Sequence, residues 1–276
     1  MAKKGEPLKC NLYIFPFSLY SIIARFAVTL GAYTDQSNKS IVIKHRLVNV
    51  HRDENIDEPY LLGLNPKGQV PTMTVEGVSL PIADSLDISY WICQIYPKLL
   101  PEKHQSKIQS LLSQLHSIEA LSLSAARPED EKEAVANPAC DNVLARTDIS
   151  EAYRRALEYK KEVDRGHMLT ALYHENIERA EEQARSLFES VNQEYQLQHD
   201  GGPWIFGDEV GPTVLDAHIV SFITRVGEAG RGRLIPDDLR QYARHIVTLP
   251  QWLEVTHGRR TLWDVSYGHV HLLSDV

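Results

Sequence analysis

The stretch Asn65-Pro-Lys-Gly-Gln-Val-Pro-Thr72 is dense in residues that form turns. It stands between Tyr60–Leu64, which predicts a short helix, and a strand that begins at Thr72. The Val70–Pro71 bond can be cis, which would turn the backbone N–H and C=O of Val70 outward. A peptide ligand can then pair with Val70 in the manner of an added strand. From this motif alone, a tight turn without a ligand is an equally good interpretation.

Short predicted strands and helices alternate on both sides of this stretch. Two strands are predicted before it, at Asn11–Phe15 and Ile41–Val50, because both are rich in β-branched and aromatic residues. Ile22–Leu30, between them, carries apolar residues at helical spacing and is expected to end at Gly31. After it, two strands are predicted at Thr72–Val75 and Val78–Ile82, joined by a turn at Glu76-Gly77. A helix is predicted at Leu86–Ile95. The order β-α-β-β-β-α predicts an α/β domain with a small mixed sheet and helices on its faces.

The chain changes character near residue 100. From Pro101 onwards, apolar residues recur at helical spacing in stripes such as Ile108–Leu121 and Ile177–Tyr195. Thr213-Val-Leu-Asp216 has the form of a capping box and opens the most apolar of these stretches. We therefore expect two domains, an α/β domain at 1–97 and an all-α domain at 101–276.

One charged segment stands apart within the second half. Residues 126–165 contain the acidic run Glu129-Asp-Glu-Lys-Glu133 together with Pro128 and Pro138. The pattern indicates an insertion at about 127–165, with a helix over Ile149–Val163. We expect a solvated excursion in preference to an acidic binding patch, because charge runs usually form solvated faces.

The composition narrows the classes of function. The 276 residues include 29 Lys and Arg against 37 Asp and Glu, a formal net charge of −8, which argues against a nucleic-acid partner. The sequence contains no apolar run of about 18 residues, so no membrane span is expected. The three cysteines form no C-x-x-C motif, and the twelve histidines show no zinc spacing. The expectation is a cytoplasmic protein without a metal site.

Asp84-Ser85 stands immediately before the third predicted helix. A serine in this place is ordinarily an N-cap. The same helix start offers N–H groups and a positive dipole end that bind a carboxylate, and the adjacent aspartate can pair with an ammonium group. The pair therefore has a second interpretation, as a site for an amino-acid head group.

Four motifs stand in register along the chain: Ser18-Leu-Tyr-Ser-Ile-Ile-Ala-Arg25, Asn65-Pro-Lys-Gly-Gln-Val-Pro-Thr72, Ala83-Asp-Ser-Leu-Asp-Ile88 and Gly211-Pro-Thr-Val-Leu-Asp-Ala217. With them the chain resembles the cytosolic glutathione transferases, over nearly its whole length outside the insertion. The resemblance implies a thioredoxin-like N-terminal domain and an all-α C-terminal domain. It also implies glutathione as co-substrate, a small hydrophobic electrophile as second substrate, and a homodimer.

The resemblance further implies which residues hold glutathione. Val70, with Pro71 cis, would pair with the cysteinyl backbone, and Gln69 lies beside this site. Asp84 and Ser85 would hold the γ-glutamyl group, although the family usually has Glu in place of this Asp.

Two other parts of the site are implied by position. The glycine carboxylate needs a cation or an amide donor, and the loop after the second strand offers His51, Arg52 and Asn55. The second substrate would lie against the first helices of the C-terminal domain, near Phe17, Tyr20, His116, Glu119 and Leu123. For His116 and Glu119, a solvated helix flank is the alternative interpretation.

The resemblance places the catalytic group at the turn between the first strand and the first helix. Aligning Ser21-Ile-Ile-Ala-Arg25 with the family's usual Ser-x-x-Val-Arg puts Ser18 where serine-type and cysteine-type classes keep their active group. A hydroxyl here donates to the ligand sulfur and favours thiolate over thiol, so Ser18 is a donor and not a nucleophile. Ser21 and Tyr20 are the alternatives. Because position 18 is not a cysteine, transferase or isomerase chemistry is favoured over thiol–disulfide exchange.

Three functions are consistent with the resemblance. The first is a transferase that adds the glutathione thiolate to a small hydrophobic electrophile, in detoxification or secondary metabolism. The second is a glutathione-dependent cis–trans isomerase of the maleylacetoacetate-isomerase type, in which the adduct rotates and then releases the thiol. The third is a protein of this fold that binds partners as a scaffold without catalysis.

Overall fold

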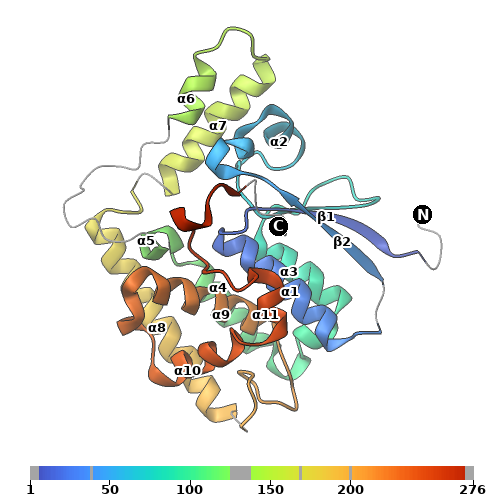
Figure 1. The fold of residues 1–276 in the computed structure, drawn as a ribbon, viewed down its shortest axis with the longest axis vertical. Coiled ribbons are helices and arrows are strands. Elements are labelled where there is room, and N and C mark those ends of the chain that lie inside the picture. The colour runs from blue at the N-terminus through green and yellow to red at the C-terminus, as the bar shows by residue number, and fades with distance from the viewer. Residues whose placement is uncertain (1–5, 38–39, 125–137, 168–169, 199–200, 271–276) are drawn as a thin grey trace.

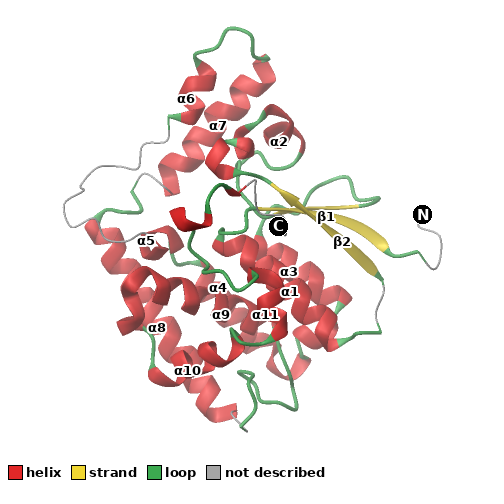
Figure 2. Cartoon of the chain, viewed as in Figure 1, coloured by secondary structure: helices red, strands yellow, loops and turns green. Residues whose placement is uncertain are grey.

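The computed structural model describes residues 6–37, 40–124, 138–167, 170–198 and 201–270 (Figure 1). The strands are β1 (Leu8–Ile14), β2 (Ile41–Leu47) and β3 (Thr72–Val75). The helices that alternate with them are α1 (Leu19–Thr34), α2 (Glu58–Gly63) and α3 (Ser85–Ile95). The helices that follow are α4 (Gln105–His116), α5 (Ala120–Ser124), α6 (Ala139–Leu144), α7 (Glu151–His167), α8 (His174–Gln198), α9 (Val214–Val226), α10 (Asp237–Ile246) and α11 (Pro250–Thr256). The described elements thus pass from an α/β part to helices alone (Figure 2).

The sheet is mixed, with the strand order β2-β1-β3. β1 pairs in parallel with β2, from Leu8 opposite Ile41 to Ile14 opposite Leu47, and it pairs antiparallel with β3. In the view of Figure 1, α1 and α3 lie below the sheet and α2 lies above it. This confirms the predicted thioredoxin-like N-terminal part followed by an all-helical part.

The fourth predicted strand is wrong for most of its length. Of Val78–Ile82, only Ile82 pairs, in an isolated bridge with Met73, where each N–H donates to the other carbonyl at 2.8 Å. Pro81 has no N–H to donate, and Val78 and Leu80 are exposed. The segment therefore lacks both the hydrogen bonds and the buried side chains of a strand.

α1 runs past the stop predicted at Gly31 and ends at Thr34. Gly31 lies inside this helix, against the ring of Tyr96 at the end of α3. A Cβ atom on Gly31 would come within 2.5 Å of Tyr96 Cδ2. The glycine therefore permits close packing of α1 and α3 and does not end the helix.

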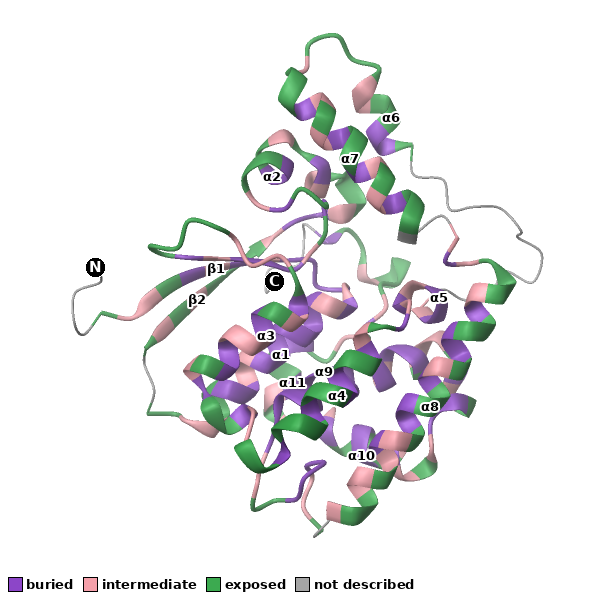
Figure 3. Cartoon of the chain, turned by 180° about the vertical axis from the view of Figure 1, so that it is seen from behind, coloured by how far each residue is buried: buried purple, intermediate pink, exposed green. Residues whose placement is uncertain are grey.

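One buried apolar cluster extends through both halves of the chain. It includes Ile22 and Phe26 of α1, Ile92 of α3 and Phe222 of α9. Phe26 also meets Trp252 of α11 edge-on, with 5.1 Å between ring centroids. Figure 3 shows buried residues on the helices at the centre of the molecule, and α9 is buried over nearly its whole length. The two predicted parts of the chain thus share one core.

The predicted insertion contains α7, which packs against the N-terminal part. The start of the insertion, up to residue 137, lies outside the described residues. Tyr153 and Leu157 of α7 join Ile56 and Leu61 in a second buried cluster, beside α2 (Figure 1). The Tyr153 hydroxyl donates to the Ile56 carbonyl at 2.8 Å. The expectation of a solvated excursion is therefore wrong for this face of α7, because its apolar residues meet those of α2.

The predicted capping box is present at the start of α9. Asp216 Oδ2 accepts from the N–H and the hydroxyl of Thr213, both at 2.7 Å. Its Oδ1 accepts from the Ile205 N–H at 3.1 Å and the Tyr242 hydroxyl at 2.7 Å. Burial raises the pKa of the Asp216 carboxyl above its ordinary value, although these donors oppose the shift. Asp216 thus joins three segments of the helical part.

Three further observations concern the described chain as a whole. Cys10, Cys93 and Cys140 are buried and form no disulfide. Among the described helices, none is both long and apolar enough to cross a bilayer. No group of three His, Cys, Asp or Glu side chains lies together as metal ligands would in the described ranges.

Candidate active site

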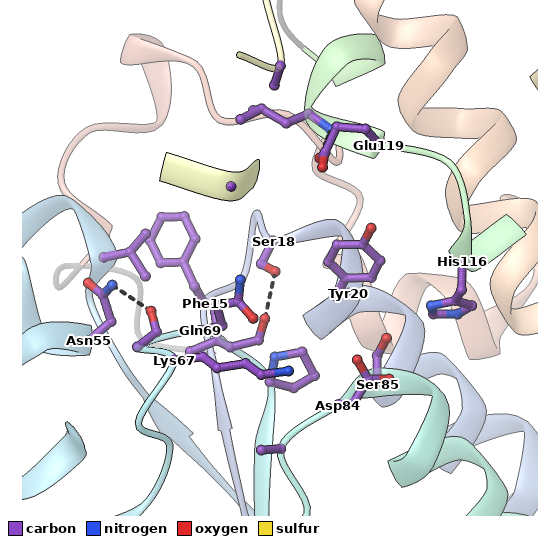
Figure 4. Close-up of a pocket in the computed structure, with 18 of the residues that line it drawn as sticks. Phe15, Ser18, Tyr20, Asn55, Lys67, Gln69, Asp84, Ser85, His116 and Glu119 are labelled. Carbon is purple, nitrogen blue, oxygen red and sulfur yellow. Dashed lines mark hydrogen bonds between the residues drawn. The ribbon is translucent and has the colours of Figure 1, made fainter. Parts of the chain in front are cut away.

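A cavity of about 860 Å³ opens between the α/β part and the helices that follow it (Figure 4). One wall comes from the turn between β1 and α1, the loop before β3 and the start of α3. The other wall comes from the end of α4 and from α5, α7 and α8. The polar residues that line it include Ser18, Tyr20, Asn55, Lys67, Gln69, Asp84 and Ser85 on the first wall, and His116, Glu119, Lys160 and Arg179 on the second.

Ser18 is the N-cap of α1 and lies beside Val70. Its Oγ accepts from the Ser21 N–H at 3.3 Å and lies 3.5 Å from the carbonyl oxygen of Val70 (Figure 4). The Val70–Pro71 bond is cis, as predicted. The Val70 N–H donates no hydrogen bond within the described part of the chain. The Ser18 hydroxyl and the Val70 backbone therefore offer polar groups to a ligand in the same cavity.

Ser21 and Tyr20, the alternatives to Ser18 as the catalytic residue, differ in their position relative to the cavity. Ser21 is buried outside the cavity lining, and its Oγ accepts from the Phe15 N–H at 3.3 Å. Tyr20 does line the cavity. Burial, reinforced by the nearby Glu119 and Asp84 carboxylates, raises the pKa of the Tyr20 phenol above its ordinary value. Tyr20 is therefore a protonated donor at neutral pH, whereas Ser21 serves the fold.

α3 begins with a buried serine that has no hydrogen-bond partner. Asp84, and not Ser85, is the N-cap, because its Oδ1 accepts from the Leu86 N–H at 2.7 Å. Ser85 is 2% exposed, lines the cavity, and its Oγ forms no hydrogen bond with the described residues. Buried hydroxyl groups are rarely left without a partner. Ser85 and the N-terminus of α3 thus mark a place for a polar ligand group.

The turn before the cis peptide bond is held by side-chain hydrogen bonds. The Gln69 carbonyl accepts from the Tyr60 hydroxyl at 2.7 Å and from Asn65 Nδ2 at 2.9 Å. The Gly68 carbonyl accepts from Asn55 Nδ2 at 2.8 Å. These bonds fix the backbone on which a pairing peptide would depend.

Comparison with known proteins places this geometry in a family. Residues 12–103 match a family model described as the N-terminal domain of glutathione S-transferase. No curated protein sequence matches the chain. A glutathione transferase from Populus trichocarpa superposes with a TM-score of 0.57 at 18% identity, covering 91% of this chain and 99% of its own. A maleylacetoacetate isomerase from Anaeromyxobacter dehalogenans, solved with bound glutathione, gives 0.55 at 16% identity, covering 92% and 98%.

The chain has the cytosolic glutathione transferase fold. Its N-terminal domain belongs to that family. A third similar structure is a maleylpyruvate isomerase described as a bacterial glutathione transferase of the zeta class. It has a TM-score of 0.53 at 17% identity and covers 92% of this chain and 100% of its own.

In this glutathione transferase fold, the loop after β2 does not bring His51 or Arg52 into the cavity lining. His51 packs edge-on between the rings of Phe15 and Trp263, with centroids 4.7 and 4.9 Å away. Arg52 is exposed. The cavity is lined near this loop by Asp53, Asn55, Lys67 and Lys160. Lys160 was not among the predicted residues, because no local pattern reveals that the insertion packs on this part of the fold.

The second-substrate residues expected from the glutathione transferase resemblance divide into two groups. Tyr20, His116 and Glu119 line the cavity, and the Tyr20 and His116 rings stack with centroids 5.9 Å apart. Phe17 and Leu123 do not line it. Phe17 is covered by the C-terminal segment, where its ring stacks on Tyr267 at 5.5 Å, and Leu123 lies in the core.

A chain of hydrogen bonds runs from His116 into the core of the glutathione transferase fold. His116 Nε2 lies 2.9 Å from His218 Nδ1, and His218 Nε2 lies 2.9 Å from Ser89 Oγ. The Ser89 hydroxyl donates to the Ser85 carbonyl at 2.7 Å, so its oxygen accepts from His218 Nε2–H. Neutral His218 then accepts from His116 Nε2–H. This assignment leaves His116 Nδ1 as the nitrogen that can gain a proton.

Arg225 of α9 ties the candidate catalytic turn to the C-terminal segment. Its Nη2 donates to the carbonyls of Phe17 and Thr261, both at 2.7 Å, and its Nε donates to Thr261 Oγ1 at 3.0 Å. Glu228 Oε2 accepts from the Thr261 N–H at 2.8 Å. Burial lowers the pKa of Arg225 to about 10, with Glu228 opposing the shift, so it remains charged at neutral pH. The turn that carries Ser18 is therefore held from the helical part.

Proposed function

We propose that this protein is a glutathione-dependent transferase that adds the glutathione thiolate to an electrophilic carbon of a small hydrophobic molecule. The proposal rests on the row of polar groups along one cavity wall: the Ser18 hydroxyl, the Val70 backbone and the buried, unpartnered Ser85 hydroxyl. A thiol-bearing tripeptide needs such groups at its sulfur, backbone and head group. The bound glutathione in the isomerase from Anaeromyxobacter dehalogenans supports the same choice of ligand.

The γ-glutamyl and cysteinyl parts of glutathione have groups of matching chemistry on this wall. The γ-glutamyl carboxylate would accept from the Ser85 hydroxyl and from N–H groups at the start of α3. Asp84 supplies the opposite charge for the γ-glutamyl ammonium. Val70 would pair through its N–H and C=O with the cysteinyl backbone.

Ser18 would set the reactivity of the thiol. Its hydroxyl donates to the sulfur, and the first turn of α1 adds positive potential, so that thiolate is favoured over thiol. The proton that the thiol loses passes to water or to the neutral imidazole of His116. The thiolate then forms a C–S bond while an electron pair of the electrophile moves onto an electron-withdrawing group. The Tyr20 phenol, which burial keeps protonated, can donate a proton to that group.

A cis–trans isomerase is the second candidate, favoured by the isomerases among the similar structures. The same thiolate would add to one carbon of a cis double bond and leave a single bond that rotates. Elimination of the thiolate would restore the double bond in the trans form. Glutathione is then recovered unchanged, and Ser18 has the same role as in the transferase.

Incubation with glutathione and a panel of electrophiles and cis-enones, with products identified by mass spectrometry, tests the proposal. Conjugates support the transferase, whereas mass-neutral conversion without consumption of glutathione identifies the isomerase. Ser18→Ala should reduce either product, and Ser190→Ala, at a half-buried serine of α8 that does not line the cavity, should not. Absence of glutathione binding in calorimetry would contradict the proposal and favour a scaffold.

We further propose a cytoplasmic homodimer, as the resemblance to the family implies. Light scattering should then give a particle mass of twice the 31.3 kDa of one chain. A mass near that of a single chain would contradict the dimer.

A further inference from the structure

Lys160 of α7 is a buried cation in the cavity wall that the chemistry above does not use. Its residue is 3% exposed and lines the cavity together with Asn55 and Gly68. A Cβ atom on Gly68 would lie 2.9 Å from Lys160 Cε and 3.0 Å from the Asn55 carbonyl oxygen. The stem of Lys160 therefore packs on the backbone that leads to Gln69 and Val70.

The Lys160 ammonium group has three N–H donors, and one of them donates to a carboxylate oxygen. Nζ donates to Asp164 Oδ1 at 2.6 Å, one helical turn further along α7, and both side chains are buried. Lys160 makes no other hydrogen bond within the described ranges of the chain. Burial of an ammonium group with unmet donors is costly, so a further anionic group in the cavity would stabilise it.

The proposed ligand has a carboxylate that would reach this end of the cavity. Figure 4 shows Asn55 on one side of Ser18 and Gln69, and Asp84 and Ser85 on the other. A tripeptide with its γ-glutamyl group at Ser85 and its cysteinyl backbone at Val70 must direct its glycine away from Ser85. Gly68 lies two residues before Val70, at most about 7 Å along the chain, and one extended ligand residue covers about half of that distance. The Lys160 side chain, whose Cε packs beside Gly68, would cover the rest.

We infer that Lys160 binds the glycine carboxylate of glutathione, with Asp164 holding the ammonium group in place. The inference rests on the proposed function and names a residue of the same site. Because α7 packs on α2, Lys160 lines the cavity, whereas His51 and Arg52 do not. Lys160 therefore offers the cation that the loop after β2 does not supply. Lys67 lines the cavity as well, but its residue is exposed, where an ion pair is weakened by solvent.

Calorimetry with glutathione and with its glycine monoethyl ester, which lacks this carboxylate charge, tests the inference. Lys160→Met removes the ammonium and keeps most of the stem. We expect it to weaken glutathione binding about ten- to a hundred-fold and to leave the affinity for the ester unchanged. Lys161→Met, at the next residue of α7, should affect neither ligand, because that lysine pairs with Asp141.

Several outcomes would overturn the inference. Equal weakening for glutathione and its ester would give Lys160 a structural role only, and unchanged binding of both would give it no role. Failure of the unmodified protein to bind glutathione would instead contradict the proposed function. Where Lys160→Met does not fold, the Lys160 Cε resonance of the unmodified, ¹³C-lysine-labelled protein replaces it. Glutathione should shift this resonance and the ester should not; an equal response to both ligands would overturn the inference.

Discussion

His116 and His218 are joined by a hydrogen bond of 2.9 Å between Nε2 of the first and Nδ1 of the second. His116 lines the cavity, whereas His218 is completely buried in α9. The bond therefore connects the candidate active site with the centre of the core. Because His218 also donates to Ser89, it accepts from His116 only while it is neutral.

The stability of the fold should depend on pH through His218. Burial holds the pKa of His218 well below its ordinary value near 6.5, which the unfolded chain would show. Below about pH 6.5 the unfolded state thus binds a proton that the folded state does not, and the free energy of unfolding falls as the pH falls. His218 alone contributes a slope of up to about 1.4 kcal/mol per pH unit, and its stabilisation is fully present above about pH 6.5. Urea unfolding should show a smaller slope for His218→Gln; an equal slope would contradict this account.

His116→Phe should impair the reaction but not glutathione binding. The phenyl ring retains the stacking on Tyr20 and removes both nitrogens. Burial lowers the pKa of His116, so a role as base requires activity to fall as the pH drops through that lowered pKa. The substitution should lower kcat at least about tenfold and abolish this acid limb. An acid limb of the same shape in the variant would exclude His116 as the group that titrates.

Asp216→Ala should strongly destabilise the protein. It leaves the buried donors of Thr213, Ile205 and Tyr242 without an acceptor. The free energy of unfolding should fall by about 3–5 kcal/mol, while Asp237→Ala, at an exposed aspartate of α10, should cost less than about 1 kcal/mol. Urea unfolding of the two variants measures the difference. Similar small losses would mean that the donors find other partners.

Arg225→Gln should loosen both the catalytic turn and the C-terminal segment. The shorter amide cannot replace the three hydrogen bonds to Phe17 and Thr261. Trypsin should then cleave several-fold faster after Arg259 and Arg260, because local opening exposes the backbone. Arg244→Gln, at an exposed arginine of α10, is the control. Equal cleavage rates in the two variants would show that Arg225 does not hold this segment.

Much of the fold can be predicted from local patterns in the sequence. The strand and helix before Gly31, the cis bond at Pro71 and the cap formed by Thr213 and Asp216 all depend on residues close together in the chain. The strand, the helix and the cap are predicted by strand composition, helical spacing and the capping-box pattern, whereas the cis bond is implied by the resemblance to the family. The extension of α1 through Gly31 was not, because it depends on the ring of Tyr96, which is distant in sequence.

The parts of the site that prediction missed are made by long-range packing. Lys160 reaches the cavity only because apolar residues of α7 meet those of α2. Val270 of the C-terminal segment packs with Phe15 and Phe17, which removes Phe17 from the cavity lining. His218 lies in the most apolar predicted helix, and nothing in its local sequence indicates that it contacts His116. Such contacts have no signature in local spacing.

The proposed reaction depends on the Ser18 hydroxyl, which is expected to lower the pKa of the bound glutathione thiol. The effect of removing this hydroxyl can be measured as a change in that pKa. The thiolate of bound glutathione absorbs in the ultraviolet, so a pH titration of the complex reports the pKa of the bound thiol. In the unmodified protein, this pKa should lie below the value of about 8.5 typical of a free thiol. In Ser18→Ala it should rise by about one unit or more, because the donor to the sulfur is lost. The same titration midpoint in both proteins would contradict the account.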